Sequence, residues 1–357
     1  MTQPDSAPPN LPLPLPLRLA TIALAVGGLA AAFAYAASWI GPQRLTPARL
    51  VDSLEQNGGV YPAYRRNHAK GLCVVGHFDS NGAGGEVSRA AVFASGSVPV
   101  VGRLAIPGGN PAASDGAAPI RSLALRFLPG HGGEWRTGMN AMPVFVVNSV
   151  QGFYALQQAS RPQPGSGKPD PAKLAAFFQA HPETAAFRAW VKSSTPSSSY
   201  ANSAYYGLNA FLLVDGQGRE HPVRWSVQPE APYQPISAEQ RGEADFLAAE
   251  LQQRLAQGPL KWRLLLTLGE PGDSTADATQ AWPAQRRSID AGELVIERAL
   301  PEQGGPCQDV NYDPLILPDG IRASDDPLLS ARSAAYSESF NRRTREQAAM
   351  PAKEPQP

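Results

Sequence analysis

Two stretches of the sequence together indicate the fold: Arg332-Ser-Ala-Ala-Tyr336 and, far upstream, Arg65-Arg-Asn-His-Ala-Lys-Gly71. Arg332 precedes Tyr336 by four residues, so on a helix the two side chains share one face. The ordinary pKa of a tyrosine is about 10, and a neighbouring guanidinium favours its charged form. The upstream stretch adds His68, an acid–base group that works near pH 7. A phenolate ligand and a histidine together predict a haem site that acts on peroxides.

The segments that link these two stretches resemble parts of the haem catalases, and they occur in the same order. Asn140 lies three residues before Pro143, as the distal asparagine of that family does. The other segments are Trp282-Pro283, Gly292-Glu-Leu-Val-Ile-Glu-Arg298, Asn311-Tyr-Asp-Pro314 and Pro318-Asp-Gly-Ile-Arg-Ala-Ser-Asp-Asp-Pro-Leu-Leu329. The resemblance spans roughly residues 50–345. The chain is therefore similar to the haem catalase superfamily, and in particular to its minimal-core branch, the catalase-related peroxidases.

This resemblance implies a haem b cofactor, held without covalent bonds, and a catalytic site on two sides of it. His68 would be the distal acid–base group, and Asn140 would hydrogen-bond and orient the peroxide. Tyr336 would be the proximal ligand of the iron, with Arg332 holding it as a phenolate. Taken singly, each residue has a structural alternative, such as a histidine satisfied in a loop, a turn asparagine or a tyrosine packed in a core.

Four further residues match positions that contact the porphyrin in the family. Arg65, Arg103 and Arg343 correspond to arginines that pair with the haem propionates, and guanidinium groups suit such carboxylates. Phe153 corresponds to an aromatic residue that stacks on the porphyrin. A solvated surface arginine and an ordinary core phenylalanine are the alternatives for these residues.

Two positions depart from the family pattern close to His68. The catalases carry a serine that orients the distal imidazole two residues after the arginine matched here by Arg103, and this chain has Ala105 there. Asn67 replaces the small valine that usually precedes the histidine, which predicts a more polar pocket. Both departures favour peroxidase activity over rapid dismutation of hydrogen peroxide.

The pattern of the chain predicts an α+β fold with a closed antiparallel β-barrel at its centre and helices around it. Short strands are expected at residues 91–93, 99–101, 123–127, 143–147, 264–268 and 294–296, and a hairpin at residues 211–225 turns at Asp215-Gly216. Helices are expected at residues 172–180, 184–192, 237–257 and from Pro327 through Arg343.

The amino terminus has a separate character. Residues 2–17 are rich in proline, with leucine and proline alternating at residues 11–17, and we expect segment 1–18 to be disordered. Residues 19–40 contain no charge and form one transmembrane helix or signal segment, since ~20 apolar residues span a bilayer. The haem domain is expected at residues 45–347 and a disordered tail at 348–357. We expect a membrane anchor with a periplasmic domain, and the alternative is a periplasmic protein released by cleavage after Ala34-Tyr-Ala36.

The composition and the cysteines restrict the partners. Lys plus Arg equals Asp plus Glu at 31 each, so no charge excess favours nucleic acid. Cys73 and Cys307 could pair in an oxidising compartment, and Cys73 in an apolar run is otherwise a small buried side chain. The resemblance to the catalase superfamily, together with the apolar segment, implies a membrane-anchored haem peroxidase that uses a peroxide and a small organic electron donor. The alternatives are a small true catalase and a non-catalytic haem-binding membrane protein. The sequence leaves the oligomeric state open, with a homodimer as one candidate.

Overall fold

The structure is a computed structural model, and it describes residues 14–36 and 44–350. It divides into two compact units, Met1–Thr46 and Pro47–Pro357. The segments predicted to be disordered at 1–13 and 351–357, and the last predicted residues of the apolar segment, 37–40, lie outside the described residues.

The described part of the first unit contains one helix, α1 (Leu15–Ala36), of 22 residues with no buried side chain. At 1.5 Å per residue it is about 33 Å long, which is enough to cross the ~30 Å hydrocarbon core of a membrane. Its length and composition thus agree with a membrane-spanning or signal helix. The helix begins four residues before the predicted Leu19. Residues Leu15 to Arg18 therefore correct the predicted disordered segment, because Pro16 falls in the first turn, where no backbone N–H needs a helical partner.

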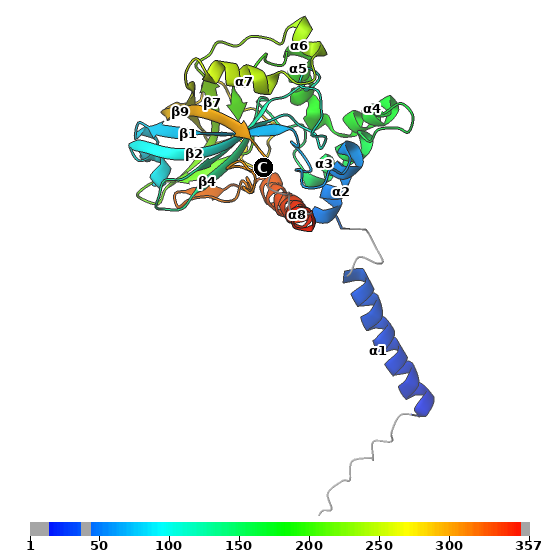
Figure 1. Ribbon diagram of the computed structural model, residues 1–357. Helices are drawn as coiled ribbons and strands as arrows, with labels where there is room; N and C mark the ends of the chain where they lie inside the picture. Colours follow the sequence, from blue (N-terminus) through cyan, green and yellow to red (C-terminus); the bar gives the residue numbers. More distant parts are fainter. Residues whose placement is uncertain (1–13, 37–43, 351–357) are drawn as a thin grey trace, which may run out of the picture. The chain divides into compact units, whose positions relative to one another are not determined.

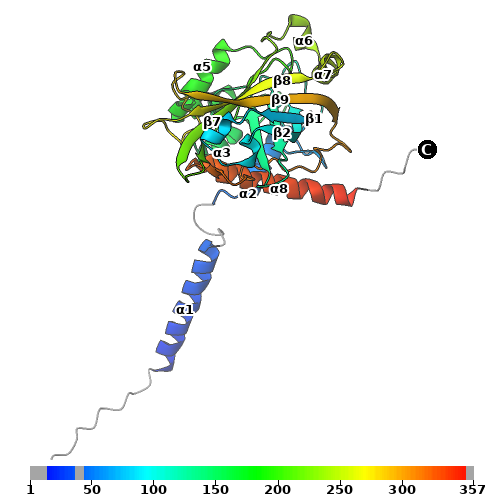
Figure 2. The same ribbon diagram turned by 90° about the vertical axis from the view of Figure 1, so that its left-hand side faces the viewer.

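The second unit is built on a closed antiparallel barrel, as predicted (Figures 1 and 2). Its strands follow one another around the ring in the order β7, β5, β4, β3, β2, β1, β9 and β8, and β8 pairs back to β7. The ring strands are β1 (Gly71–Ser80), β2 (Gly96–Ala105), β3 (Ser122–Phe127), β4 (Trp135–Asn140), β5 (Tyr205–Tyr206), β7 (Glu220–Pro229), β8 (Leu260–Leu268) and β9 (Ser288–Pro301). Two more strands, β6 (Phe211–Val214) and β10 (Ile321–Ala323), extend the sheet from β7, and β6–β7 is the predicted hairpin.

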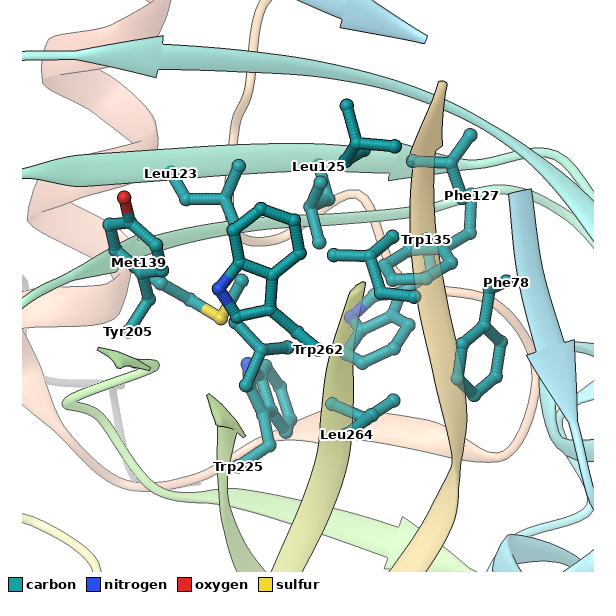
Figure 3. Close-up of a cluster of buried hydrophobic side chains, with 14 of the residues drawn as sticks. Phe78, Leu123, Leu125, Phe127, Trp135, Met139, Tyr205, Trp225, Trp262 and Leu264 are labelled. Atoms are coloured by element: carbon teal, nitrogen blue, oxygen red, sulfur yellow. The ribbon is translucent and has the colours of Figure 1, made fainter. Parts of the chain in front are cut away.

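Large apolar side chains fill the inside of the barrel, so any ligand site of this unit lies outside it. Figure 3 shows Phe127, Trp135, Trp225 and Trp262 gathered inside it. The rings of Phe127 and Trp135 stack with their centroids 4.6 Å apart, and Trp135 meets Trp225 edge-on at 4.9 Å. Each such buried side chain stabilises the fold by roughly 1.5–3 kcal/mol. Because successive side chains of a strand point to opposite faces, the residues between these core positions face outward.

Helices lie outside the barrel, above and below its strands in the view of Figure 2, and complete the unit (Figures 1 and 2). The longest, α8 (Pro327–Ala349), starts at the predicted Pro327, and its N-cap Asp326 accepts a hydrogen bond from the Leu328 N–H at 2.9 Å. The helix α8 packs against α2 (Pro47–Gly58), and α2 also contacts α3 (Val150–Ala159). The remaining helices are α4 (Pro171–Ala180), α5 (Ala185–Ser193), α6 (Ala238–Gly242) and α7 (Leu247–Leu255), with short 3₁₀ turns at Ala83–Glu86, Ala91–Phe93 and Pro182–Thr184.

Some local predictions were wrong. Residues 91–93 form a 3₁₀ turn, and residues 143–147 are irregular, although Val92, Val144 and Val146 are buried as the apolar pattern suggested. The helix predicted at 237–257 is divided into α6 and α7. Buried Asp115 causes the division, because its carboxylate accepts the N–H groups of Phe246 and Leu247 at 2.9 and 3.0 Å and so starts a new helix. The last helix continues to Ala349, two residues into the predicted tail.

Candidate active site

A cavity of about 240 Å³ lies between the outer face of the barrel wall and the helices α2, α3 and α8. Strand alternation builds its wall: Leu125 of β3 packs in the barrel core, whereas Ser122 and Ala124 line the cavity. The cavity is lined by every residue that the sequence analysis singled out for the site, namely Arg65, His68, Arg103, Asn140, Phe153, Arg332, Tyr336 and Arg343. The structure therefore brings these distant segments together at one place.

His68 lies in the segment just before β1, in an unusual backbone conformation. Its φ angle is 57°, in the left-handed region, which costs a residue with a side chain roughly 1–2 kcal/mol. The Asn67 side chain holds this turn, since its Oδ1 accepts from the His68 N–H at 2.9 Å and from the Gly108 N–H at 2.8 Å. This oxygen is therefore committed to the backbone, and Asn67 also lines the cavity, as the expectation of a more polar pocket requires.

The surroundings of His68 keep its imidazole neutral. The side chain borders the cavity but is enclosed by protein, and this burial, followed by the charges of Arg103, Arg332 and Arg65, lowers its pKa to about 3. The Ile106 carbonyl opposes the shift. The Nδ1 atom is buried and has no hydrogen-bond partner among the described residues. At neutral pH the ring is therefore an uncharged base that can accept a proton.

Asn140 ends β4 and faces Ser122 directly across the β3–β4 ladder. The Ser122 hydroxyl donates to Asn140 Oδ1 at 2.6 Å. This bond occupies the amide oxygen, so the amide nitrogen is left to donate to a ligand in the cavity. The sequence analysis missed Ser122, because pairing across two strands depends on their register, which neither residue signals alone.

The pair Arg332 and Tyr336 lies on one face of α8, as the spacing predicted. The Arg332 guanidinium is 6.0 Å from the centre of the Tyr336 ring. Its Nη1 donates to the Oδ1 atom of buried Asn209, whose amide nitrogen in turn donates to Asp326 at 2.7 Å. This chain of hydrogen bonds fixes the arginine from outside the helix, and nothing local in the sequence pointed to Asn209.

The Tyr336 hydroxyl group lies beside Gly138 of β4. A Cβ atom placed on Gly138 would lie 3.5 Å from both the Tyr336 hydroxyl oxygen and Arg332 Nη2. The phenol oxygen and the guanidinium thus come to the same point of the barrel wall. The wall there bears no side chain, so the oxygen stays open to the cavity.

The three arginines predicted to hold propionates converge on Glu302, which the sequence analysis did not identify. Glu302 follows the end of β9 and accepts from Arg65 Nε at 2.8 Å and from Arg103 Nη2 at 2.6 Å, with Arg343 Nη1 at 3.9 Å. Burial opposes its ionisation, but Arg103 and Arg65 outweigh burial and hold the pKa of the carboxyl below its usual value. Burial, followed by the charge of Arg65, lowers the pKa of Arg343 to about 10.

This arginine cluster fits a ligand that carries two carboxylates. Among the described residues, Arg103 Nε and the Nε and Nη2 atoms of Arg343 are buried donors without a partner. Both side chains are 3% exposed, and one carboxylate does not balance three guanidinium charges. Buried donors are normally satisfied, so further acceptor oxygens, and anionic ones in particular, fit this end of the cavity. The two propionates of a haem would supply them.

Phe153 of α3 and a disulfide complete the surroundings. The ring of Phe153 stacks on Phe145 with the centroids 6.1 Å apart and presents an aromatic wall to the cavity. Cys73 and Cys307, which the sequence left open, form a disulfide with their Cα atoms 5.4 Å apart. Arg65 Nη2 donates to the Cys307 carbonyl at 3.0 Å, so the disulfide loop also supports the arginine cluster.

An antiparallel barrel with a tyrosine–arginine helix, a neutral histidine and an arginine cluster on one cavity defines a haem-type oxidoreductase scaffold. Comparison with known proteins makes the class specific. A profile of the family described as Catalase matches residues 34–356. The chain belongs to the catalase family.

Two relatives are similar along almost their whole lengths. The catalase-related peroxidase of Synechococcus elongatus is 38% identical over 326 residues, which is 91% of this chain and 96% of the relative. The catalase-related peroxidase of Mycolicibacterium paratuberculosis is 32% identical over 303 residues, which is 84% of this chain and 95% of the relative.

Solved structures show the same fold. A fungal catalase superposes with a TM-score of 0.70 at 20% identity, and a bacterial catalase with 0.71 at 19%. Each comparison covers 85% of this chain, but the chain spans only 64% and 62% of those two catalases. The predicted barrel fold is therefore confirmed, whereas the roles of individual site residues stay predictions.

Proposed function

We propose that the protein is a haem-dependent peroxidase that reduces hydrogen peroxide or organic peroxides with a small organic electron donor. The observation that carries this proposal is the meeting of His68, Asn140 and the Arg332–Tyr336 pair on one cavity. The two relatives named catalase-related peroxidase support it. As a member of that group the chain is an oxidoreductase that acts on peroxides.

The cofactor we infer is haem b, and this chain offers a partner for each of its parts. Tyr336 would provide the ligand oxygen, Arg65, Arg103 and Arg343 would pair with the propionates, and Phe153 would pack against the porphyrin. When bound, the haem supplies the redox centre for peroxide reduction. Both cysteines are committed to the disulfide, which leaves neither thiol to attach the porphyrin covalently.

Proton transfer falls to His68. Its pKa of about 3 leaves the ring neutral at physiological pH, so it can accept a proton from one oxygen of the peroxide. It then returns the proton to the other oxygen while the O–O bond breaks, and this oxygen departs as water or as an alcohol. Two electrons and two protons from the organic donor would reduce the remaining oxygen to water. Positioned acid–base groups of this kind contribute about 10²–10⁴ in rate.

Arg332 and Asn140 assist at the two ends of the cavity. The Arg332 guanidinium beside Tyr336 favours the phenolate that an iron ligand requires. Asn140, with its oxygen occupied by Ser122, would donate its amide N–H to the peroxide and hold it within reach of His68. The peroxide would thus be oriented before the proton moves.

Peroxidase activity is favoured over dismutation by the distal side of the cavity. Ala105 brings no hydroxyl to His68, and the buried Nδ1 atom of the ring has no partner among the described residues. A ring without a side-chain hydrogen bond is less firmly oriented than one that has such a bond. A small true catalase is the second candidate, because His68 and Asn140 are both in place.

The test compares two activities of the purified protein loaded with haemin. We expect oxidation of a dye reductant by hydrogen peroxide to exceed oxygen evolution at the same peroxide concentration. Oxygen evolution that dominates would indicate a small catalase. Absence of both activities, with haem bound, would indicate a haem-binding protein without turnover and would overturn the proposal.

The location we infer is a membrane anchor with the haem domain on the periplasmic side, and release after signal cleavage is the alternative. An apolar amino-terminal helix and a disulfide are features of secreted or membrane-associated proteins. Membrane fractionation of the full chain tests the anchor, since cleavage would move the haem domain to the soluble fraction. Thiol labelling without reductant tests the compartment, because a domain kept in the cytoplasm would show free cysteines.

A further inference from the structure

Asn67 connects two segments that form the distal end of the cavity. Its Oδ1 atom accepts the N–H groups of His68 and Gly108, at 2.9 and 2.8 Å. The Ala69 N–H donates to the Gly108 carbonyl at 2.9 Å, beside the same bonds. The loop that follows β2 is thus joined to the segment that precedes β1, with His68 between the two attachment points.

The backbone of His68 explains why such a connection matters. A φ of 57° is a conformation that a residue other than glycine adopts only when its surroundings impose it. If the turn relaxed, φ would change sign and the Cα–Cβ bond of His68 would rotate away from the cavity. The two hydrogen bonds that Asn67 Oδ1 accepts, one of them from the His68 N–H itself, oppose that relaxation.

The ring of His68 has a backbone carbonyl beside it, that of Ile106, but no side-chain hydrogen bond among the described residues. Its Nδ1 atom lacks a partner in the part of the chain that the structure describes, and Ala105 offers no hydroxyl. Ser122, which pairs with Ala105 across β2 and β3, uses its hydroxyl on Asn140. The orientation of the imidazole therefore depends on backbone groups, namely the turn at His68 and the Ile106 carbonyl.

We propose that Asn67 is a positioning residue for the peroxidase reaction, acting as a side-chain clamp on the left-handed turn that aims His68 into the cavity. This inference rests on the proposed function only for its effect on turnover. The clamp itself is a property of the haem-free chain and can be measured there. A carboxylate at the same position would keep both acceptor bonds, so the amide as such is not required.

The experiment compares Asn67→Ala with Asn67→Asp. Asn67→Ala loses both hydrogen bonds, and we expect turnover per bound haem at limiting peroxide to fall about tenfold. Asn67→Asp retains an oxygen at the same place and should stay within about threefold of the native rate. In the haem-free proteins, amide exchange at His68 and Gly108 should accelerate in Asn67→Ala and remain native in Asn67→Asp.

The matched control is Asn81→Ala, at the other end of β1. The Asn81 side chain likewise makes two bonds to backbone, accepting from the Ala83 N–H and donating to the Asp290 carbonyl, both at 2.9 Å, away from the cavity. Asn81→Ala should lower stability while turnover per haem stays native. If Asn67→Ala does not fold, Asn67→Ser, with its oxygen one bond closer to the backbone, should show a smaller loss of the same kind.

Three results separate the possibilities. Unchanged exchange at His68 in Asn67→Ala would overturn the clamp, whatever the activity. Faster exchange with native turnover per haem would overturn its role in the reaction and leave a purely structural one. A native protein that binds haem but lacks peroxidase activity would defeat the proposed function, and the exchange data would still decide whether the clamp exists.

Discussion

The two sides of the cavity are built in contrasting ways. Tyr336 and Arg332 lie on a regular helix of 23 residues, and their relative position follows from helical spacing. His68 lies on a left-handed turn that is held by the side chain of its neighbour and by a loop after β2. The helix face offers a ligand atom and a charge, whereas the turn offers a base that can accept a proton and return it. We therefore assign retention of the cofactor to the helix and the reaction itself to the turn.

The largest effect that this comparison predicts is on the helix. Tyr336→Phe removes the ligand oxygen while keeping the ring, so the protein should lose its haem during gel filtration. Haem content per chain is the measurement. Arg332→Ala should cost less, since it weakens the phenolate but leaves the oxygen in place. If Arg332→Ala loses more haem than Tyr336→Phe does, the two roles are assigned wrongly.

The second prediction concerns the turn. His68→Ala should keep its haem and lose about 10²–10⁴ in peroxidase rate, because the group that moves the proton is gone. Stopped-flow mixing of the haem-loaded variant with peroxide measures this rate. His131→Ala, at an exposed loop position, is the control and should behave like the native protein. A loss of less than tenfold in His68→Ala would remove the histidine from its role.

The helix side was the more predictable one from sequence. The start of α8 at Pro327 follows from a proline at the first helical position, and the four-residue spacing gave the shared face of Arg332 and Tyr336. The barrel followed from short strands divided by turn residues, and β6–β7 from Asp215-Gly216. Local chemistry determines each of these features, so sequence alone is enough to find them.

The turn side depends on contacts between distant segments, which explains what was missed. Ser122 acts on Asn140 because of the β3–β4 register, and Asn67 acts through Gly108. Glu302 meets arginines from three other elements, and a single glutamate near a glycine-rich turn gives no sign of that. The division between α6 and α7 likewise arises from distant Asp115.

Lowering the pH should also change the stability of the fold through His68, on the turn side of the cavity. The pKa of His68 is about 3 in the folded protein and ordinarily 6.5. Between these two pH values the unfolded chain therefore binds a proton at His68, whereas the folded chain does not. As pH falls from 6.5 towards 3, His68 therefore costs stability, by at most about 1.4 kcal/mol per pH unit. Urea unfolding of the haem-free protein at pH 7, 5 and 4 should show a shallower decline for His68→Ala than for the native chain. Equal declines would mean that the ring is not held neutral.

The smallest effect expected is at Ala105. Ala105→Ser would give His68 a side-chain partner and should raise oxygen evolution relative to dye oxidation by less than tenfold, since one neutral hydrogen bond is worth about 1 kcal/mol. Ala124→Ser, at another alanine of the cavity wall, is the matched control and should leave the ratio unchanged. A flat ratio in Ala105→Ser at full haem occupancy would move the explanation from orientation of the imidazole to access of the reductant.

We propose that the cavity between the His68 turn and α8 holds one haem through Tyr336. The most direct test is a titration of the haem-free native protein with haemin, followed by visible absorption, beside the same titration of Tyr336→Phe. We predict saturation at one haem per chain with a Soret band distinct from that of free haemin, and no such saturation for Tyr336→Phe. The same saturating band in both proteins, or none in the native chain, would contradict this assignment.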